Sequence, residues 1–201
     1  MTRILVVDDQ ALVRGALAAL LDLEDDLQVV GQVDSGPAAV DFVRDTSVDV
    51  VLLDIEMPGG GGIDALPDLL TAPTPPRVLV VTTFGRPGYL RRALDAGASG
   101  FVVKDCPPAE LLEAVRRTAA GLRTVDADLA AESALAGPNP LSPRETDVLR
   151  LAADGQGVAE IAGALFLSPG TVRNHLSSAI GKTGARTSAG AATTARDNGW
   201  L

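Results

Sequence analysis

The chain has 201 residues, more than the roughly 100–150 of one typical domain, so its length favours two compact units. Hydrophobic residues make up 46% of it and aromatic residues only 3%, which argues against a disordered chain and predicts an aliphatic core that suits an α/β protein. The single cysteine, Cys106, excludes an internal disulfide and a cysteine-cluster zinc site, and no apolar run approaches the roughly 20 residues of a membrane span. We therefore expect a soluble, cytoplasmic protein with no membrane partner.

The net charge of −9 is unevenly distributed. Residues 1–124 carry 11 basic and 18 acidic side chains, a net charge of −7, and residues 125–140 add three acids and no base. Residues 141–201 carry six bases and five acids, a net charge of +1. The change of sign places a small basic footprint, of the kind that nucleic acid attracts, in the C-terminal part alone.

The first 122 residues alternate short aliphatic runs with helical patterns. The runs are rich in Val, Leu and Ile, which is typical of strands buried on both faces of a parallel sheet. Repeated βα units predict a doubly wound α/β domain with a five-stranded parallel sheet. Strands are expected at Arg3–Val7, Leu27–Val33, Asp49–Leu53, Arg77–Thr82 and Ser99–Val103, and helices at Ala11–Leu21, Pro37–Arg44, Ile63–Leu70, Pro87–Ala96 and Pro107–Ala120.

Polar residues stand at the ends of four of these strands. Asp8 and Asp9 follow the first and Asp54 the third, while Thr82 ends the fourth and Lys104 follows the fifth. Ligands of such sheets bind beyond the carboxyl ends of the strands, so these side chains are expected to meet. Three neighbouring carboxylates repel one another, and a set of oxygen ligands suits Mg²⁺. A carboxylate nucleophile, a hard cation and a lysine are the parts that phosphoryl transfer needs.

Each of these residues taken alone has a plainer interpretation. A lone Asp54 after a strand is as often a turn or helix-capping residue, and a lone Lys104 is more often a solvated surface side chain. Their joint placement at successive strand ends is what favours a phosphoryl-transfer site.

Several motifs of this part resemble the receiver domain of response regulators over residues 3–121. They are Ile4–Asp9, Leu53–Gly59 with Gly62, Thr82-Thr83, Ala96–Phe101 and Lys104. The resemblance implies a flavodoxin-like (CheY-like) fold in which Asp54 accepts a phosphoryl group from a sensor histidine kinase.

The same resemblance implies roles for the neighbouring residues. Mg²⁺ is the implied cofactor, and its ligands would be the carboxylates of Asp8, Asp9 and Asp54 with the backbone carbonyl of Glu56. Lys104 would contact the phosphoryl group, Thr82 would be the switch hydroxyl, and Phe101 would be the switch aromatic residue that turns inward on phosphorylation. Pro58 and Gly62 would shape the loop after Asp54.

Residues 123–140 are expected to link two domains. Val125–Ala136 has the composition of a short acidic helix, but Gly137–Pro140 cannot continue one. Residues 141–201 are then expected to form a small, all-α domain.

Helix starts are clear in this second domain. Ser142-Pro143-Arg144-Glu145 fits a capping box with a proline in the first turn, and Ser168-Pro169 fits a second start of the same type. The short turn Phe166–Ser168 suits a helix-turn-helix. A final helix is expected at Ser188–Arg196.

The helix that follows Ser168 is expected to bury Val172, Leu176 and Ile180 and to expose three polar side chains. These are Arg173, Asn174 and Ser177, of which arginine and asparagine are residue types that read base edges. On a helical bundle met alone they would more often be ordinary solvated positions. His175, the only histidine, cannot form a site with several histidine ligands and is expected to be structural.

Further motifs make this domain similar to the LuxR-type DNA-binding domain. They are Leu141–Glu145, Val148-Leu149, Glu160–Ala162, Leu167-Ser168 and Gly170–His175, and with the receiver in front the chain resembles the NarL/FixJ subfamily. The implied partners are double-stranded promoter DNA, a second copy of the chain after phosphorylation, and RNA polymerase. The implied DNA-binding residues are Thr171, Arg173, Asn174 and Ser177 on the recognition helix, with Lys182 and Arg186 mainly attracting phosphate.

Two rival functions remain open at this point. An aspartate-nucleophile phosphatase would also carry Asp54, but such enzymes place the nucleophile after the first strand, and the helix-turn-helix would have no role. A constitutive DNA-binding protein would leave the receiver unphosphorylated, and the complete acidic pocket with Lys104 argues against it. We expect a regulator rather than an enzyme.

Overall fold

The structure is a computed structural model that describes residues 1–57, 62–83, 85, 87–126, 129–131, 133 and 138–201. The chain divides into two compact units, the first of residues 1–85 and 90–130 and the second of residues 131–201 with 86–89. In the described part no helix has the length and apolar character that crossing a bilayer requires.

The first unit is built on one parallel sheet with the strand order β2-β1-β3-β4-β5-β6. The expected doubly wound architecture is confirmed, and its switch point lies between β1 and β3. The strands are β1 Thr2–Val7, β2 Leu27–Val33, β3 Val50–Leu53, β4 Arg77–Thr82, β5 Gly100–Val103 and β6 Thr124–Val125. The helices are α1 Ala11–Leu21, α2 Gly36–Asp45, α3 Gly62–Leu70, α4 Pro87–Asp95 and α5 Pro108–Ala119.

The sixth strand corrects the expectation of five. Thr124 and Val125 pair in parallel with Gly100 and Phe101, so the start of the expected linker is part of the receiver sheet. Val125 therefore does not open the helix expected at Val125–Ala136; Leu129–Ala131 and Ser133 are helical, and residues 127–128, 132 and 134–136 lie outside the described part. A two-residue strand has no measurable periodicity, so only the free edge of β5 determines it.

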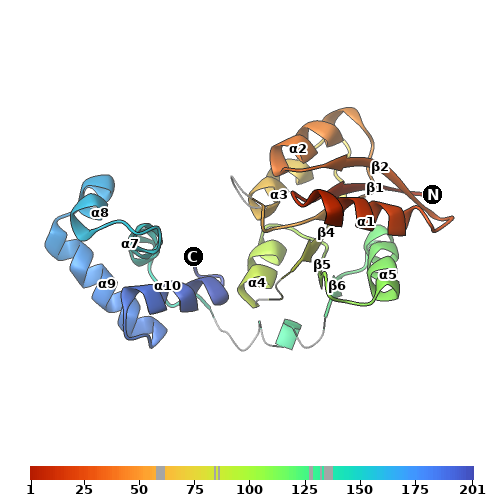
Figure 1. The fold of residues 1–201 in the computed structure, drawn as a ribbon. Helices are drawn as coiled ribbons and strands as arrows, with labels where there is room; N and C mark the ends of the chain where they lie inside the picture. The colour runs from red at the N-terminus through yellow and green to blue at the C-terminus, as the bar shows by residue number, and fades with distance from the viewer. Residues whose placement is uncertain (58–61, 84, 86, 127–128, 132, 134–137) are drawn as a thin grey trace. The chain divides into compact units, whose positions relative to one another are not determined.

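Aliphatic side chains fill the space between the sheet and the helices on its two faces. Residues alternate along each strand, so Ile4 and Val6 of β1 face one side with Leu52 of β3, where α1 and α5 cover them. Figure 1 shows α1 and α5 together on one side of the sheet and α2, α3 and α4 on the other. The centre of the sheet is buried on both faces, which is why its strands appear as continuous aliphatic runs.

Within residues 138–201, all of which the structure describes, the second unit contains the helices α7 Pro143–Ala153, α8 Val158–Leu165, α9 Pro169–Thr183 and α10 Ser188–Asp197. The capping box expected at Ser142 is present, because the Ser142 hydroxyl accepts from the Glu145 N–H and the Glu145 carboxylate accepts from the Ser142 N–H. Ser168 likewise caps α9 by accepting from the Thr171 N–H. The expected helix starts are thus confirmed.

The turn between α8 and α9 contains Phe166 in the left-handed conformation, with φ of 56°. Its N–H bonds back to the end of α8, and α9 begins three residues later. Val172 and Ala179 of α9 are buried, and Leu176 and Ile180 are partly buried against the neighbouring helices. The expectation of a helix-turn-helix with an apolar inner stripe on its second helix is confirmed.

Candidate functional site

Backbone hydrogen bonds beyond the strand ends hold the polar residues of the sheet edge. The N–H of Asp8 donates to the Val33 carbonyl at 3.1 Å and that of Asp54 to the Val7 carbonyl at 2.9 Å. The Lys104 N–H donates to the Thr82 carbonyl at 2.7 Å. Each bond extends a parallel ladder by one residue, so the sheet itself fixes where these side chains begin.

Lys104 joins two buried carboxylates. Its Nζ lies 2.7 Å from Asp54 Oδ2 and 2.8 Å from Asp8 Oδ2, and both aspartate side chains are 1% exposed. Burial opposes the positive charge of Lys104, but the contacts that its ammonium makes with the Asp54 and Asp8 carboxylates outweigh this effect and raise the pKa of Lys104 above its ordinary value. The lysine is therefore held protonated at the point where the two carboxylates converge.

The other carboxylate oxygens show room for a cation. Asp8 Oδ1 accepts from the Gln10 N–H at 2.8 Å and Asp54 Oδ1 from the Glu56 N–H at 3.2 Å. Among the described residues, the buried Asp9 Oδ1 has no hydrogen-bond partner, and Asp8 Oδ2 has only the ion pair with Lys104. One oxygen each from Asp8, Asp9 and Asp54 lie within 4.8 Å of one another. Because buried anionic oxygens need compensation, this donor set fits a hard divalent cation.

The remaining receiver residues lie around this cluster in different ways. Thr82 is fully buried at the carboxyl end of β4, paired with Val103 just before Lys104. Phe101 is also fully buried. The resemblance implies that Phe101 turns inward on phosphorylation, but in this structure its side chain already lies inside the protein. Pro58 lies outside the described residues.

Gly62 lies against the backbone of the site. A Cβ atom built on it would stand 1.9 Å from the Asp54 carbonyl oxygen and 3.0 Å from Leu53 Cγ. The first residue of α3 can approach the Asp54 backbone this closely only because it has no side chain.

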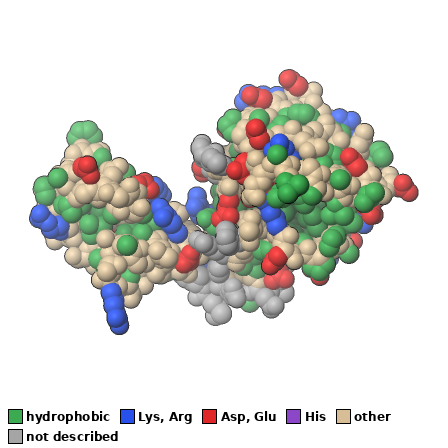
Figure 2. Space-filling view, viewed as in Figure 1, with side chains coloured by type: hydrophobic (Ala, Val, Ile, Leu, Met, Phe, Trp, Pro, Cys, Tyr) green, Lys and Arg blue, Asp and Glu red, His purple; other side chains and the backbone are tan. Residues whose placement is uncertain are grey.

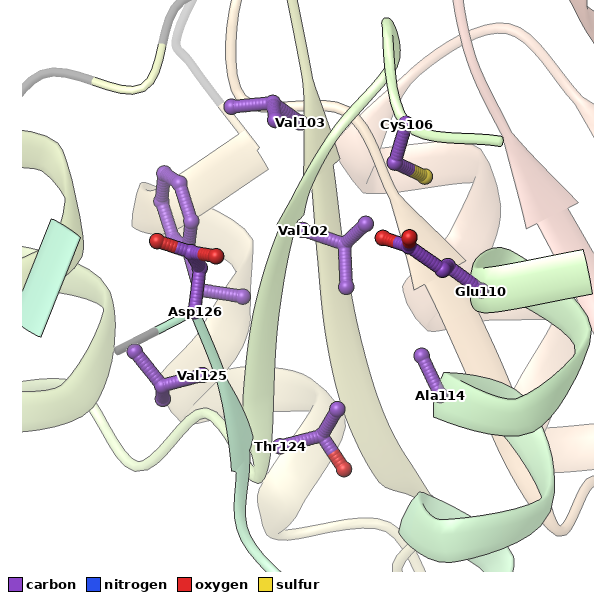
Figure 3. A pocket seen from close by; sticks show the side chains of 9 residues that line it. Val102, Val103, Cys106, Glu110, Ala114, Thr124, Val125 and Asp126 are labelled. Carbon is purple, nitrogen blue, oxygen red and sulfur yellow. The ribbon is translucent and has the colours of Figure 1, made fainter. Parts of the chain in front are cut away.

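A hollow of about 310 Å³ lies at the sheet edge formed by β5 and β6, next to α5. Figure 3 shows the Glu110 carboxylate and the Cys106 sulfur directed toward the same space beside Val102. Burial, helped by the charges of Glu110 and Asp105, raises the pKa of the Cys106 thiol. A raised thiol pKa favours the uncharged form, which agrees with a structural rather than a redox cysteine.

The three polar side chains of α9 that the sequence predicts to be exposed, Arg173, Asn174 and Ser177, are exposed. Arg173, and Arg186 just after α9, make no ion pair within the described residues. The Thr171 hydroxyl lies 2.8 Å from the Ser168 hydroxyl, so it is partly engaged in the helix cap.

Lys182 makes an ion pair that the sequence does not predict. Its Nζ lies 2.7 Å from Oε2 of Glu145, a buried carboxylate of α7. Burial alone would raise the pKa of Glu145, but the bonds from Lys182, Ser178 and Ser142 outweigh it and hold that pKa at about 2. Sequence reasoning identified Glu145 only as a capping residue, because no local pattern connects it to a helix more than thirty positions away.

Comparison with known proteins supports both halves of this description. Residues 4–116 match the family model for the response regulator receiver domain, and residues 139–195 match that for bacterial regulatory proteins of the luxR family. The transcriptional regulatory protein DesR of Bacillus subtilis (strain 168) is 42% identical over 201 residues, all of both chains. The response regulator RamR of Streptomyces coelicolor is 40% identical over 202 residues, covering 100% of this chain and 98% of RamR.

Solved structures agree. The response regulator ChrA of a heme-sensing two-component system is 33% identical with a TM-score of 0.58, over 99% of this chain and 98% of ChrA. RcsB of Salmonella enterica serovar Typhimurium, bound to promoter P1flhDC with the phosphomimetic BeF3⁻, is 26% identical with a TM-score of 0.73, over 98% of each chain. The chain therefore belongs to the response regulators in which a receiver domain precedes a LuxR-type DNA-binding domain, and it is a transcriptional regulator of that family.

Proposed function

We propose that this regulator is controlled by transfer of a phosphoryl group to Asp54 from a sensor histidine kinase or a small phosphodonor such as acetyl phosphate. The proposal is supported by the bridge of Lys104 between Asp54 and Asp8, beside the buried Asp9 Oδ1, which has no hydrogen-bond partner among the described residues. The transfer forms a bond from an Asp54 carboxylate oxygen to phosphorus while the bond to the donor nitrogen or oxygen breaks.

The proposed cofactor is Mg²⁺, held by the carboxylates of Asp8, Asp9 and Asp54 and the backbone carbonyl of Glu56. When bound, it supplies positive charge that neutralises the oxygens of the transferring group. Lys104 is already protonated at the same place and contacts the phosphoryl oxygens as its bond to Asp54 is replaced. Thr82, at the neighbouring strand end, is proposed as the hydroxyl that senses the new group, and Phe101 as part of the core that responds to it.

Phosphorylation is tested with the full chain and acetyl phosphate. The wild-type protein should gain one phosphoryl group on Asp54 by mass spectrometry only when Mg²⁺ is present, and Asp54→Asn should gain none. Equal labelling of the Asp54→Asn protein would refute the assignment. The same experiment addresses a phosphatase role, since catalytic turnover of a small phosphate ester, lost in Asp54→Asn, would favour an enzyme.

We propose that the second unit binds double-stranded promoter DNA through α9. Arg173 and Asn174, with Thr171 and Ser177, would lie at base edges, and Arg186 would attract phosphate. On sites selected from a random library, Arg173→Ala should cost about 1–3 kcal/mol, mainly at one base position. If the relative preferences among site variants stay unchanged, Arg173 does not read bases. A charge-only contributor, Arg186→Gln, is the matched control.

Dimerisation of the phosphorylated receiver is proposed to place two DNA-binding domains on half-sites about one helical turn apart. The outer side of α1 supports a partner surface, because Leu12 is 86% exposed and Ala16 and Ala19 follow it on the same stripe. Figure 2 shows hydrophobic side chains gathered over this part of the first unit. Helix α5 offers no such surface through Leu111, Leu112, Ala114 and Val115, because these side chains are buried in the core.

Phosphorylation-dependent pairing separates this proposal from a constitutive regulator. Equal occupancy of a selected DNA site with and without acetyl phosphate would favour the constitutive alternative. RNA polymerase is proposed as the partner that dimers on DNA would contact.

A further inference from the structure

The inference concerns Glu145, which connects the first helix of the DNA-binding unit to its recognition helix. Its side chain is 7% exposed, and both carboxylate oxygens are engaged. Oε1 accepts from the Ser178 hydroxyl at 2.6 Å, and Oε2 accepts from the Ser142 N–H at 2.6 Å and from Lys182 Nζ at 2.7 Å. Of the two lysines in the chain, one is held in the acidic pocket and the other is held here.

The two α9 residues that contact Glu145 lie on one side of that helix. Ser178 and Lys182 are four residues apart, so they form one stripe directed toward α7. Lys182 comes nine residues after Arg173, which at about 100° per residue places it about 180° around the helix from that arginine. The stripe that Glu145 holds is therefore distinct from the side that carries Arg173 and Ser177, whereas Asn174, four residues before Ser178, lies at the N-terminal end of that stripe.

The charge of Lys182 is matched by a buried charge of opposite sign. Moving the ammonium to a DNA phosphate would leave the Glu145 carboxylate buried without its cation, which is unfavourable. Lys182 is itself 40% exposed, and Arg173 and Arg186 differ from it in that neither makes an ion pair within the described residues. The recognition region therefore offers fewer positive charges to DNA phosphates than the number of its basic residues indicates.

We propose that Glu145 is a specificity-determining positioning residue, which withholds the charge of Lys182 from DNA while it fixes the rotation of α9 against α7. The proposal rests on the proposed DNA binding of the second unit, and it replaces the expected phosphate contact of Lys182. Attraction to phosphate is independent of base sequence, so removing one unit of it lowers binding to all sites. The direct base contacts are retained, and the ratio of specific to non-specific affinity rises.

The experiment measures binding of the full chain to a labelled DNA duplex of mixed sequence as the salt concentration is varied. Each phosphate neutralised by a side chain contributes about 0.9 to the slope of log affinity against log salt concentration. Four variants are compared with wild type: Glu145→Gln, Lys182→Met, the double variant, and Arg186→Gln as the matched loss of an exposed, unpaired charge. Circular dichroism and thermal melting show whether each variant is folded.

Glu145→Gln keeps the size of the side chain and releases Lys182, so its slope should steepen by about 0.9. Its loss of affinity between about 50 and 200 mM salt should be about three- to four-fold larger than that of wild type. Lys182→Met should leave the slope unchanged, the double variant should restore the wild-type slope, and Arg186→Gln should flatten it by about 0.9.

A Lys182→Met slope as flat as that of Arg186→Gln would overturn the proposal, even if Glu145→Gln failed to fold. A folded Glu145→Gln protein with the wild-type slope would overturn it as well. If neither wild type nor Arg186→Gln bound the duplex in a salt-dependent manner, DNA binding by this unit would itself be wrong. The failure of this inference is therefore distinguishable from the failure of the proposed function.

Discussion

Replacing Gly62 with alanine tests how tightly α3 begins against the phosphoacceptor residue. The added Cβ would stand 1.9 Å from the Asp54 carbonyl oxygen and 3.0 Å from the Asp54 carbonyl carbon. The contacted atoms belong to the backbone, and the Asp54 N–H is bound to the Val7 carbonyl of β1 at 2.9 Å, so no flexible side chain can move aside. Overpacking of this kind costs about 1–3 kcal/mol.

A loss of that size should lower the melting temperature of the receiver by roughly 3–15 °C, measured by calorimetry on the full chain. Displacement of the Asp54 backbone should also slow phosphorylation by acetyl phosphate, because Asp54 must stay aligned with Lys104 and the cation site. Gly15→Ala is the matched control. Gly15 lies within α1 and its Cβ would meet no atom within 4 Å, so this change should stabilise the protein by about 0.5–1 kcal/mol.

A Gly62→Ala protein that melts at the wild-type temperature and is phosphorylated at the wild-type rate would contradict the close approach of α3 to the Asp54 backbone. That result would mean that α3 begins farther from Asp54 than the structure places it. A lower melting temperature in both alanine variants would instead point to a general effect of substitution at glycine.

The pKa of Glu145 in the folded protein is about 2, below its ordinary value of 4.5, so the stability that its charge contributes is complete above about pH 4.5 and is lost as the pH falls toward 2. In urea unfolding, the free energy of unfolding should therefore fall less on acidification in Glu145→Gln than in wild type, and an equal fall in both would contradict the ion pair. Asp9→Asn should weaken Mg²⁺ binding by at least about 1 kcal/mol, and it should raise the melting temperature of the metal-free protein because it relieves repulsion between carboxylates. Calorimetry with and without Mg²⁺ measures both effects, and an unchanged affinity for Mg²⁺ would show that Asp9 is not a ligand. Leu12→Glu should abolish dimerisation of the phosphorylated protein in light scattering, whereas Leu23→Glu, at a residue 79% exposed outside α1, should not; a dimeric Leu12→Glu protein would exclude α1 as the interface.

The sequence alone determined the elements whose signals are local. The central strands of a parallel sheet are covered on both faces, so they appear as aliphatic runs, and their carboxyl ends meet at one edge. That is why the sequence predicts that Asp8, Asp54 and Lys104 lie together. The helix starts at Ser142 and Ser168 were equally readable, because a capping side chain acts within three residues of itself.

The tertiary structure decided the features that depend on contacts between distant segments. Strand β6 exists because β5 offers a free edge to Thr124 and Val125, and two residues have no pattern of their own. Phe101 is buried by its neighbours in space, so the sequence could identify the residue but not its position. Lys182 looked like a free cation in the sequence, and only the packing of α7 against α9 brings it to Glu145. An ion pair between helices depends on how those helices pack, and that arrangement is set by the burial of the whole core rather than by the residues next to either charge.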